Sequence, residues 1–201
     1  MSEGDSPQRS IDPIERGRAV IDTVRVIALI AIVFLGFGAR AVTFRSPLLD
    51  HHSWRQADSA SISRNFFRHG LNPLFPEIDQ RAYGSRGYVE TGFEVHAFAV
   101  AAISRGIGWF APETGRFLGA LLFLVTAALA HAFARRRYGS DGALACLCIY
   151  SLGLPLSLFI DRAFMNEGWL TLLSILTFVS VARYLQAPSK LDLLLWVLAA
   201  T

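Results

Sequence analysis

Long uncharged runs separated by short polar junctions dominate the chain. Runs of membrane-spanning type are predicted at residues 24–44, 116–134, 142–160, 167–185 and 191–201. An apolar helix of about 20 residues matches the thickness of a bilayer. The last run is still apolar where the sequence ends, so we expect the chain to be the N-terminal fragment of a longer protein. The pattern predicts an all-α, polytopic helical membrane protein.

The first run is free of charge from Val26 to Ala39 and extends to Phe44 if Arg40 reaches the membrane interface with its side chain. The polar residues 1–22 before it show no apolar period and are predicted to form a disordered tail. An alternative is a cleaved signal peptide, because residues 39–41 (Ala-Arg-Ala) match the small-x-small pattern of a cleavage site. The long polar tail and the spans that follow favour an uncleaved helix.

Arginine residues set the predicted orientation. Basic residues precede the first run, and Arg135, Arg136 and Arg137 follow the second. Because basic loops stay in the cytosol, the N-terminus and this cluster are predicted to be cytosolic. Residues 45–115 then form one long outer loop, and the turn at 161–167 lies on the same face of the membrane.

The outer loop is predicted to carry two helices that lie at the membrane surface. Residues 58–69 have apolar positions at helical spacing, and Gly70 follows where a C-cap would. The segment Phe93–Phe110 is apolar but contains Glu94 and Arg105, so we expect a helix in the interface rather than a span.

Composition supports the membrane assignment. The chain is 53% hydrophobic and only 17% charged, whereas soluble domains are about a quarter charged. Its net charge of +3 comes mainly from arginine. No basic run is interleaved with aromatic residues, so we expect membrane lipids as partners and no nucleic acid.

The densest group of polar residues follows the first run directly. Residues 50–58 read Asp-His-His-Ser-Trp-Arg-Gln-Ala-Asp. Asp50 and Asp58 are eight positions apart, so one helical face can carry both carboxylates. A carboxylate at the membrane boundary can deprotonate an acceptor hydroxyl. We predict Asp50 as the catalytic base, assisted by Asp58 or Glu90. The simpler role for Asp50 is the N-cap of the helix that follows.

Several neighbours suit substrate binding, each with a simpler alternative. Arg55 can bind a phosphate through two hydrogen bonds, or pair with Asp58 on the same helix. Arg116 lies at the outer mouth of a span, where it would meet a lipid phosphate or anchor to headgroups. Trp54 can stack on a sugar or anchor at the interface. The complete set of predicted substrate-binding residues is His51, His52, Trp54, Arg55, Gln56, Arg116 and Asp161. For Asp161 the alternative is an ion pair at a helix junction.

The sequence predicts no cofactor. It has no glycine-rich nucleotide loop. His51 and His52 suit a divalent metal, but adjacent residues rarely bind one ion and no third ligand stands at a standard spacing. A metal is therefore not favoured.

The layout resembles the GT-C membrane glycosyltransferases, in the branch of protein O-mannosyltransferases and lipid A aminoarabinose transferases. The resemblance is carried by Asp50 just past the first span, the surface helix at 93–110, Arg116 at the start of a span, and Arg-Arg-Arg-Tyr-Gly at 135–139. Asp161 falls in the second outer turn, where relatives often carry Asp. Two departures stand out. Those relatives usually have Asp-Glu where this chain has Asp-His at 50–51. They often have Lys-Pro-Pro where it has Gly-Phe-Glu at 92–94.

The resemblance implies a glycosyltransferase of the bacterial inner or plasma membrane. It would move a sugar from a polyprenyl-phosphate donor to a lipid, glycan or protein acceptor on the outer face, with Asp50 as the base. The residues alone leave other classes open. A non-catalytic membrane protein whose outer loop docks a partner is the first. A small transporter is the second, disfavoured because the spans hold almost no ionisable residues.

Overall fold

The computed structural model describes residues 13–48, 52–80, 87–89 and 93–200. Within these ranges the chain is almost entirely helical and contains no strand, apart from an isolated antiparallel bridge between Glu77 and Tyr88. The elements are α1 (Pro13–Ala41), α2 (Ser53–His69), α3 (Val95–Ile107), α4 (Pro112–Cys148), a π-helix η1 (Ile149–Gly153), α5 (Pro155–Ile160), α6 (Glu167–Gln186) and α7 (Lys190–Ala200). The predicted all-α fold is confirmed.

Among the described residues, three helices are long and apolar enough to cross a membrane. They are Ile14–Ala41, Pro112–Gly153 and Glu167–Gln186. The apolar helix α3 is too short to span, as predicted for a helix at the surface. The structure therefore has the helices of a membrane protein, three of them of spanning length.

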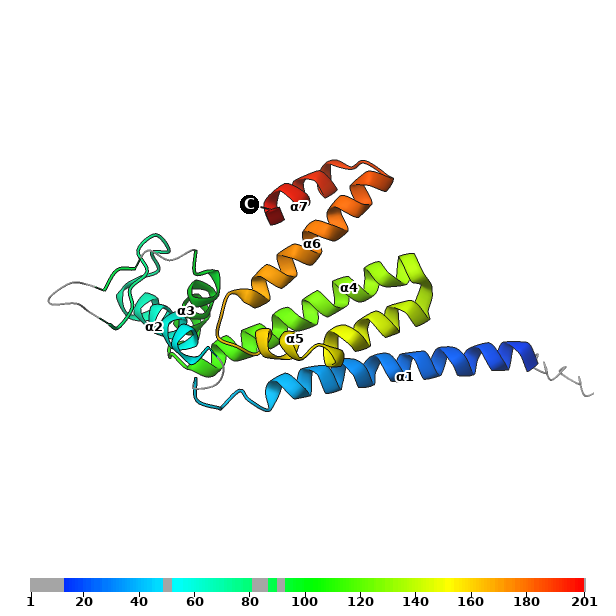
Figure 1. Cartoon of the computed structure of the whole chain (residues 1–201), viewed down its shortest axis with the longest axis horizontal. Helices are drawn as coiled ribbons and strands as arrows, with labels where there is room; N and C mark the ends of the chain where they lie inside the picture. The colour runs from blue at the N-terminus through cyan, green and yellow to red at the C-terminus, as the bar shows by residue number, and fades with distance from the viewer. Residues whose placement is uncertain (1–12, 49–51, 81–86, 90–92, 201) are drawn as a thin grey trace, which may run out of the picture.

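The longest of these segments is folded back on itself at Gly139 (Figure 1). Gly139 has φ 74° and ψ −175°, a conformation that is open to glycine and strained for other residues. Leu147 on the return arm packs against Phe123 and Ala127 on the first arm. The predicted spans 116–134 and 142–160 are thus the two arms of a helical hairpin.

The return arm is bent just before Pro155. The π-helix η1 ends at Gly153, and Leu154 is extended, with φ −109° and ψ 102°. Proline disfavours the helical conformation of the residue before it and cannot donate a backbone hydrogen bond. The kink predicted from Pro155 is confirmed.

The molecule has two different ends (Figure 1). At one end, α2, α3 and the described residues between them form a cap, beside the end of α1, the start of α4 and the connection from α5 to α6. We call this the cap end. The opposite end holds the N-terminal part of α1, the turn at Gly139 and the connection from α6 to α7, and we call it the arginine end. The predicted outer segments therefore share one end, and the predicted cytosolic segments share the other.

Two expectations about helix boundaries need correction. Residues 13–22 belong to α1 and are not irregular. Pro13 at the first helical position and Glu15 in the first turn favour a helix start here. The cap helix α2 begins at Ser53, five residues earlier than predicted, and ends at His69 with Gly70 as its C-cap, as expected.

The cap is fixed to the bundle by apolar packing. Ile62 and Phe66 of α2 pack against Ala97 and Ala101 of α3 within the cap. Phe164, fully buried in the connection from α5 to α6, packs against both cap helices through Ala60 and Val100. This ring joins the cap to the spanning helices.

Candidate functional site at the junction of cap and bundle

The connection between α5 and α6 packs closely against α4, because two glycines of α4 face it. A Cβ atom on Gly119 would lie 2.5 Å from the backbone oxygen of Asp161. A Cβ atom on Gly115 would overlap the ring of Phe164. Residues 161–167 therefore lie between α4 and the cap. We call the region formed by these residues, the start of α2 and Glu94 the junction.

Glu94, at the N-cap position of α3, is the central carboxylate of the junction. Its Oε2 atom accepts hydrogen bonds from Ser59 Oγ at 3.3 Å and Asn166 Nδ2 at 3.1 Å. Asn166 Oδ1 in turn accepts from the backbone N–H of His96 at 2.9 Å. Burial raises the pKa of Glu94, and its two hydrogen bonds and the charge of Arg55 oppose that rise. A carboxylate whose pKa is raised is a stronger base than an ordinary one.

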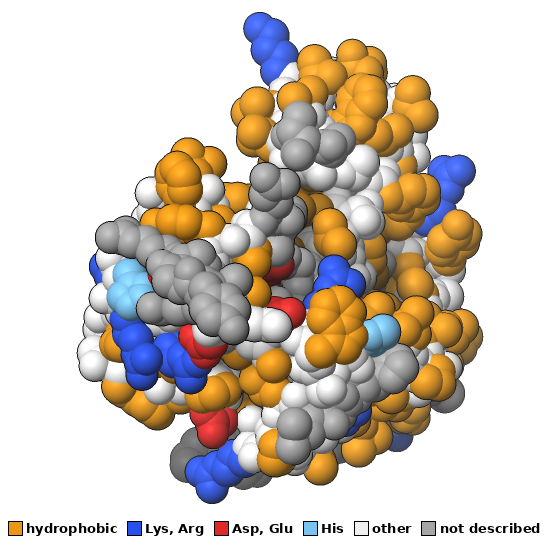
Figure 2. Space-filling view, turned by 60° about the vertical axis from the view of Figure 1, so that its left-hand side comes forward, with side chains coloured by type: hydrophobic (Ala, Val, Ile, Leu, Met, Phe, Trp, Pro, Cys, Tyr) orange, Lys and Arg blue, Asp and Glu red, His pale blue; other side chains and the backbone are white. Residues whose placement is uncertain are grey.

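Arg55 pairs across the junction with Glu167, at 3.1 Å between Nη1 and Oε1. The alternative considered for Arg55 was a pair with Asp58 on the same helix, whereas the structure pairs it with Glu167 between α2 and α6. The Arg55 side chain is 53% exposed, so a guanidinium group stands at the open edge of the junction. Figure 2 shows acidic and basic side chains together around a hollow on this face.

Three of the predicted site residues, Asp50, His51 and Glu90, lie outside the described residues. The N-cap residue of α2 is His52. Both predicted roles of Asp50, as the base and as an N-cap, stay predictions. His52 has a left-handed backbone, with φ 57°, and its ring lies 6.2 Å from that of Phe159. His52 therefore stands at the junction, beside α5.

Trp54 and Asp58 lie on the exposed side of α2. The Trp54 side chain is 68% exposed, and Asp58 is also exposed. Exposure leaves Trp54 available both for stacking on a sugar and for anchoring in a membrane interface. The two predicted roles of Trp54 stay open.

Gln56 and Arg116 are buried, and each forms hydrogen bonds with the backbone of a distant segment. Gln56 Oε1 accepts from the N–H of Phe164 at 3.2 Å. The Arg116 guanidinium donates to the backbone oxygens of Thr43 and Pro47, which ties the segment after α1 to the start of α4. Both residues were predicted to touch substrate. Their hydrogen bonds give both residues a structural role, and substrate contact stays a prediction.

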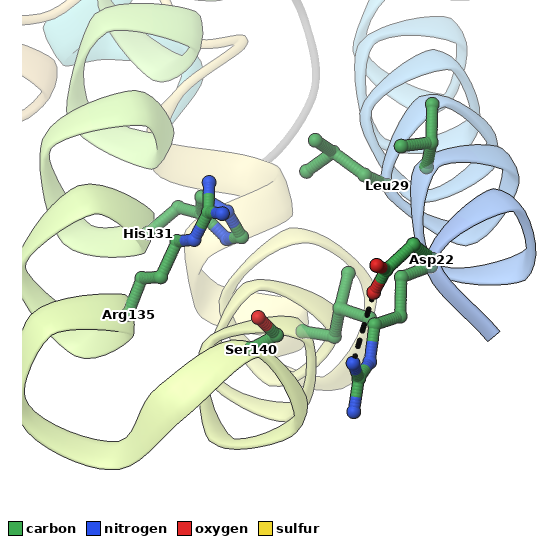
Figure 3. A pocket seen from close by; sticks show the side chains of 8 residues that line it. Asp22, Leu29, His131, Arg135 and Ser140 are labelled. Carbon is green, nitrogen blue, oxygen red and sulfur yellow. Dashed lines mark hydrogen bonds and ion pairs between the residues drawn. The ribbon is translucent and has the colours of Figure 1, made fainter. Parts of the chain in front are cut away.

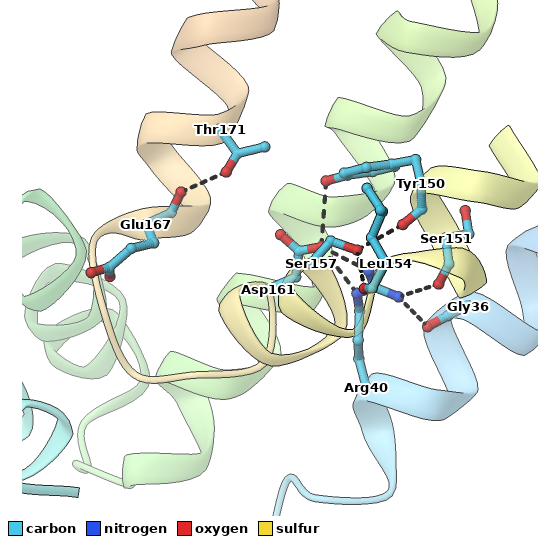
Figure 4. A network of polar contacts seen from close by, with 9 residues as sticks. All are labelled: Gly36, Arg40, Tyr150, Ser151, Leu154, Ser157, Asp161, Glu167 and Thr171. Atoms are coloured by element: carbon cyan, nitrogen blue, oxygen red, sulfur yellow. Dashed lines mark hydrogen bonds and ion pairs between the residues drawn. The ribbon is translucent and has the colours of Figure 1, made fainter. Parts of the chain in front are cut away.

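Asp161 is also buried, in an ion pair with Arg40 (Figure 4). Its Oδ2 atom accepts from Arg40 Nη2 at 2.8 Å and Nε at 3.2 Å. Arg40 also donates to the backbone oxygens of Gly36 and Ser151, and its guanidinium carbon lies 3.6 Å from the centre of the Phe123 ring. Of the roles considered for Asp161, the structure supports the ion pair at a helix junction.

The expectation that Arg40 reaches out to the membrane interface is wrong. Its side chain is 0% exposed and turns inward, because a carboxylate 121 residues away completes its hydrogen bonds. A usable signal existed in the sequence. An arginine at the end of one span and an aspartate in an outer turn were predicted on the same face of the membrane.

The cap contains a pocket that sequence reasoning missed. Its volume is about 590 Å³, within the range of ligand sites. The polar wall includes a contact between His69 Nδ1 and Glu77 Oε2 at 3.2 Å. The aromatic wall is Phe75 and Tyr88, edge to face at 5.8 Å. Aromatic faces beside amide, imidazole and carboxylate groups suit a ring-shaped ligand rich in hydroxyls. We call this the cap pocket.

Within the described ranges, no group of three or more His, Cys, Asp or Glu side chains could hold a metal ion. No protein-family model, curated protein or solved structure matches the chain. A functional assignment therefore depends on the chemistry of the junction and the cap pocket.

Proposed function

We propose that the protein is a glycosyltransferase that moves a sugar from a polyprenyl-phosphate donor to an acceptor hydroxyl at the cap end. The observation that carries the proposal is the pair of groups at the junction. A partly buried carboxyl group, Glu94, lies in the electrostatic range of a half-exposed guanidinium, Arg55. Both stand at one end of helices that can span a membrane, where the phosphate of a membrane lipid would be reached.

Arg55 is the proposed ligand of the donor phosphate. A guanidinium binds a phosphate through two parallel hydrogen bonds, and such charged bonds are about twice as strong as neutral ones. The ion pair with Glu167 holds Arg55 toward α6, at the open edge of the junction. When a phosphate approaches, the guanidinium can turn from the carboxylate to the phosphate without leaving the junction.

In the proposed reaction the acceptor oxygen forms a bond to the anomeric carbon of the sugar. The bond from that carbon to the phosphate oxygen breaks, and the polyprenyl phosphate leaves with the electron pair. A carboxylate takes the proton of the acceptor hydroxyl, which typically contributes a factor of about 10² to 10⁴ to the rate. Asp50, two positions before His52, is the candidate from the sequence, and Glu94 is the candidate that the structure adds.

The cap pocket is the proposed site for the acceptor. Its aromatic pair would stack against a sugar or another ring, while Asn65, Asn72 and Glu77 would select hydroxyl groups. Asn65 and Ser59 stand on the same helix, which links the cap pocket to the junction. In this proposal the acceptor would reach the donor from the cap side of the junction.

The order of elements supports the resemblance to GT-C enzymes. A spanning helix, α1, is followed by α2 and α3, which do not span, and then by the hairpin of α4. The arginines at the opposite end support a cytosolic N-terminus in a bacterial inner or plasma membrane, with the cap outside.

The test is transfer of a radiolabelled sugar from polyprenyl-phosphate donors by membranes that contain the protein. Asp50→Asn and Glu94→Gln are compared with Asp141→Asn, a carboxyl change at the arginine end. We expect one of the first two to lower transfer by about 10²-fold or more at equal protein level. Asp141→Asn should leave it unchanged. If Glu94 is the base, Glu94→Gln should also remove the acidic limb of the pH–rate profile.

Two results would overturn the proposal. One is wild-type protein that transfers no sugar from any donor pool, which would favour the docking of a partner on the cap. The other is transfer that survives both carboxyl changes, because then neither candidate base takes part.

A further inference from the structure

A second pocket of interest lies at the arginine end, between the first arm of α4 and α6. Its volume is about 310 Å³. Apolar side chains, including Leu129, Phe133 and Val179, line the part toward the middle of the helices. Arg136, Arg137 and Arg183 line the part toward the end of the bundle. We call this the arginine pocket.

The chemistry of the arginine pocket is that of an amphipathic anion site. Three arginines from two helices line the pocket beside its apolar wall. Arginines near the end of a helix are favoured by its dipole, which accounts for their presence at this level. The dipole does not account for their gathering around an apolar recess. Arg183 forms an ion pair with Asp192, at 3.1 Å between Nε and Oδ1.

A neighbouring pocket at the same end provides an internal comparison. It lies between α1 and α4, has the same volume of about 310 Å³, and includes Asp22, His131 and Arg135 (Figure 3). Its cation Arg25 is engaged by Asp22 at 3.2 Å and by Asp141 at 2.8 Å. Carboxylates thus offset the positive charge there. The lining of the arginine pocket contains three arginines and no carboxylate, and the carboxylate that pairs with Arg183, Asp192, lies outside that lining.

We infer that the arginine pocket binds the phosphate headgroup of an anionic phospholipid. The guanidinium groups would hold the phosphate, and an acyl chain would run along the apolar wall between α4 and α6. Basic pockets between spanning helices bind such headgroups in membrane proteins. A free phosphate would satisfy the arginines but leave the apolar wall uncovered. This site is separate from the junction, and the inference is independent of the proposed glycosyltransferase function.

The test uses the purified protein in bilayer discs of zwitterionic phosphatidylcholine. Short-chain phosphatidylglycerol is added, and its binding is measured by native mass spectrometry. The double variant Arg136→Gln/Arg137→Gln is compared with Arg25→Gln/Arg135→Gln, which removes the same charge at the same end. We expect the first to weaken binding about tenfold or more and the second less than twofold. Circular dichroism checks that each variant keeps its helices.

Equal weakening by the two double variants would overturn the inference, because general charge attraction would then explain the binding. So would glycerol phosphate, which has the headgroup without acyl chains, if it bound as tightly as the lipid. A third variant, Val179→Gln, places a polar group on the apolar wall. It should weaken lipid binding while leaving the arginines unchanged, and normal binding would exclude the wall from the site.

Discussion

The two ends of the bundle carry charge in opposite ways. At the cap end, Arg40, Arg116 and Asp161 are at most 1% exposed, and each is bonded to partners on other segments. At the arginine end, Arg136 and Arg137 are exposed beside an apolar pocket. The same residue type therefore supports the interior at one end and faces the surroundings at the other.

The difference shows that charge at a helix end does not by itself define a role. A buried charge is tolerated only where hydrogen bonds and an opposite charge replace water. The cap end meets that condition because the connection from α5 to α6 folds in beneath the cap. The arginine end has short connections and no cap, so its guanidinium groups stay outside.

The largest expected effect comes from breaking the buried pair at the cap end. Asp161→Ala leaves the Arg40 guanidinium buried without its carboxylate, and we expect unfolding in detergent to become easier by about 3–5 kcal/mol. Denaturant titration followed by circular dichroism measures the change. The double variant Arg40→Leu/Asp161→Leu removes both charges and should be less destabilised than Asp161→Ala. If it is equally or more destabilised, the pair is not held by charge compensation.

A pH effect of comparable size is expected from His96 in the cap. Burial lowers its pKa from 6.5 to about 4. Between these values the unfolded chain binds a proton that the folded protein does not. The free energy of unfolding is therefore highest above pH 6.5. It falls by about 3 kcal/mol in total as the pH drops toward 4. The difference in unfolding free energy between wild type and His96→Gln should shrink over this range. A constant difference would contradict the prediction.

A smaller effect is expected where α4 meets the connection from α5 to α6. In Gly119→Ala the new Cβ atom would lie 2.5 Å from a backbone oxygen of Asp161, so the backbone must shift. We expect a loss of about 1–3 kcal/mol, as for other overpacked interiors. Gly106→Ala in α3 is the control, because nothing lies within 4 Å of its Cβ position. It should stabilise the protein by about 0.5–1 kcal/mol. Matching losses for both would show that packing at Gly119 is not the cause.

The smallest effect is expected at the exposed pair of the arginine end. Arg25 contacts Asp141 through two hydrogen bonds of 2.8 and 2.9 Å, but both groups lie in solvent-accessible positions. Such pairs contribute little to stability and are screened by salt. Arg25→Gln should leave the unfolding midpoint unchanged in 0.5 M salt. A clear loss of stability at that salt concentration would show that this exposed pair stabilises the protein as the buried pair does. The contrast between the two ends would then not hold.

The sequence by itself determined the features that depend on local pattern. Apolar runs gave the helices that are long enough to span a membrane, and the order of arginine clusters gave the relative placement of the two ends. Gly70 and Pro155 marked a helix end and a kink, because glycine and proline act on the backbone wherever they stand. It also placed Arg55 and its neighbours at the cap end, where the junction lies.

Only the tertiary structure decided which of the polar and charged side chains are buried. Arg40 meets Asp161 from 121 positions away, and Gln56 meets the backbone of Phe164 from 108 positions away. Glu94 became the central carboxylate of the junction through Asn166, which lies in the connection from α5 to α6, directly before α6. A charged side chain beside an apolar run can turn to water or to a partner. The free energies of these choices depend on a distant segment, which no local pattern contains.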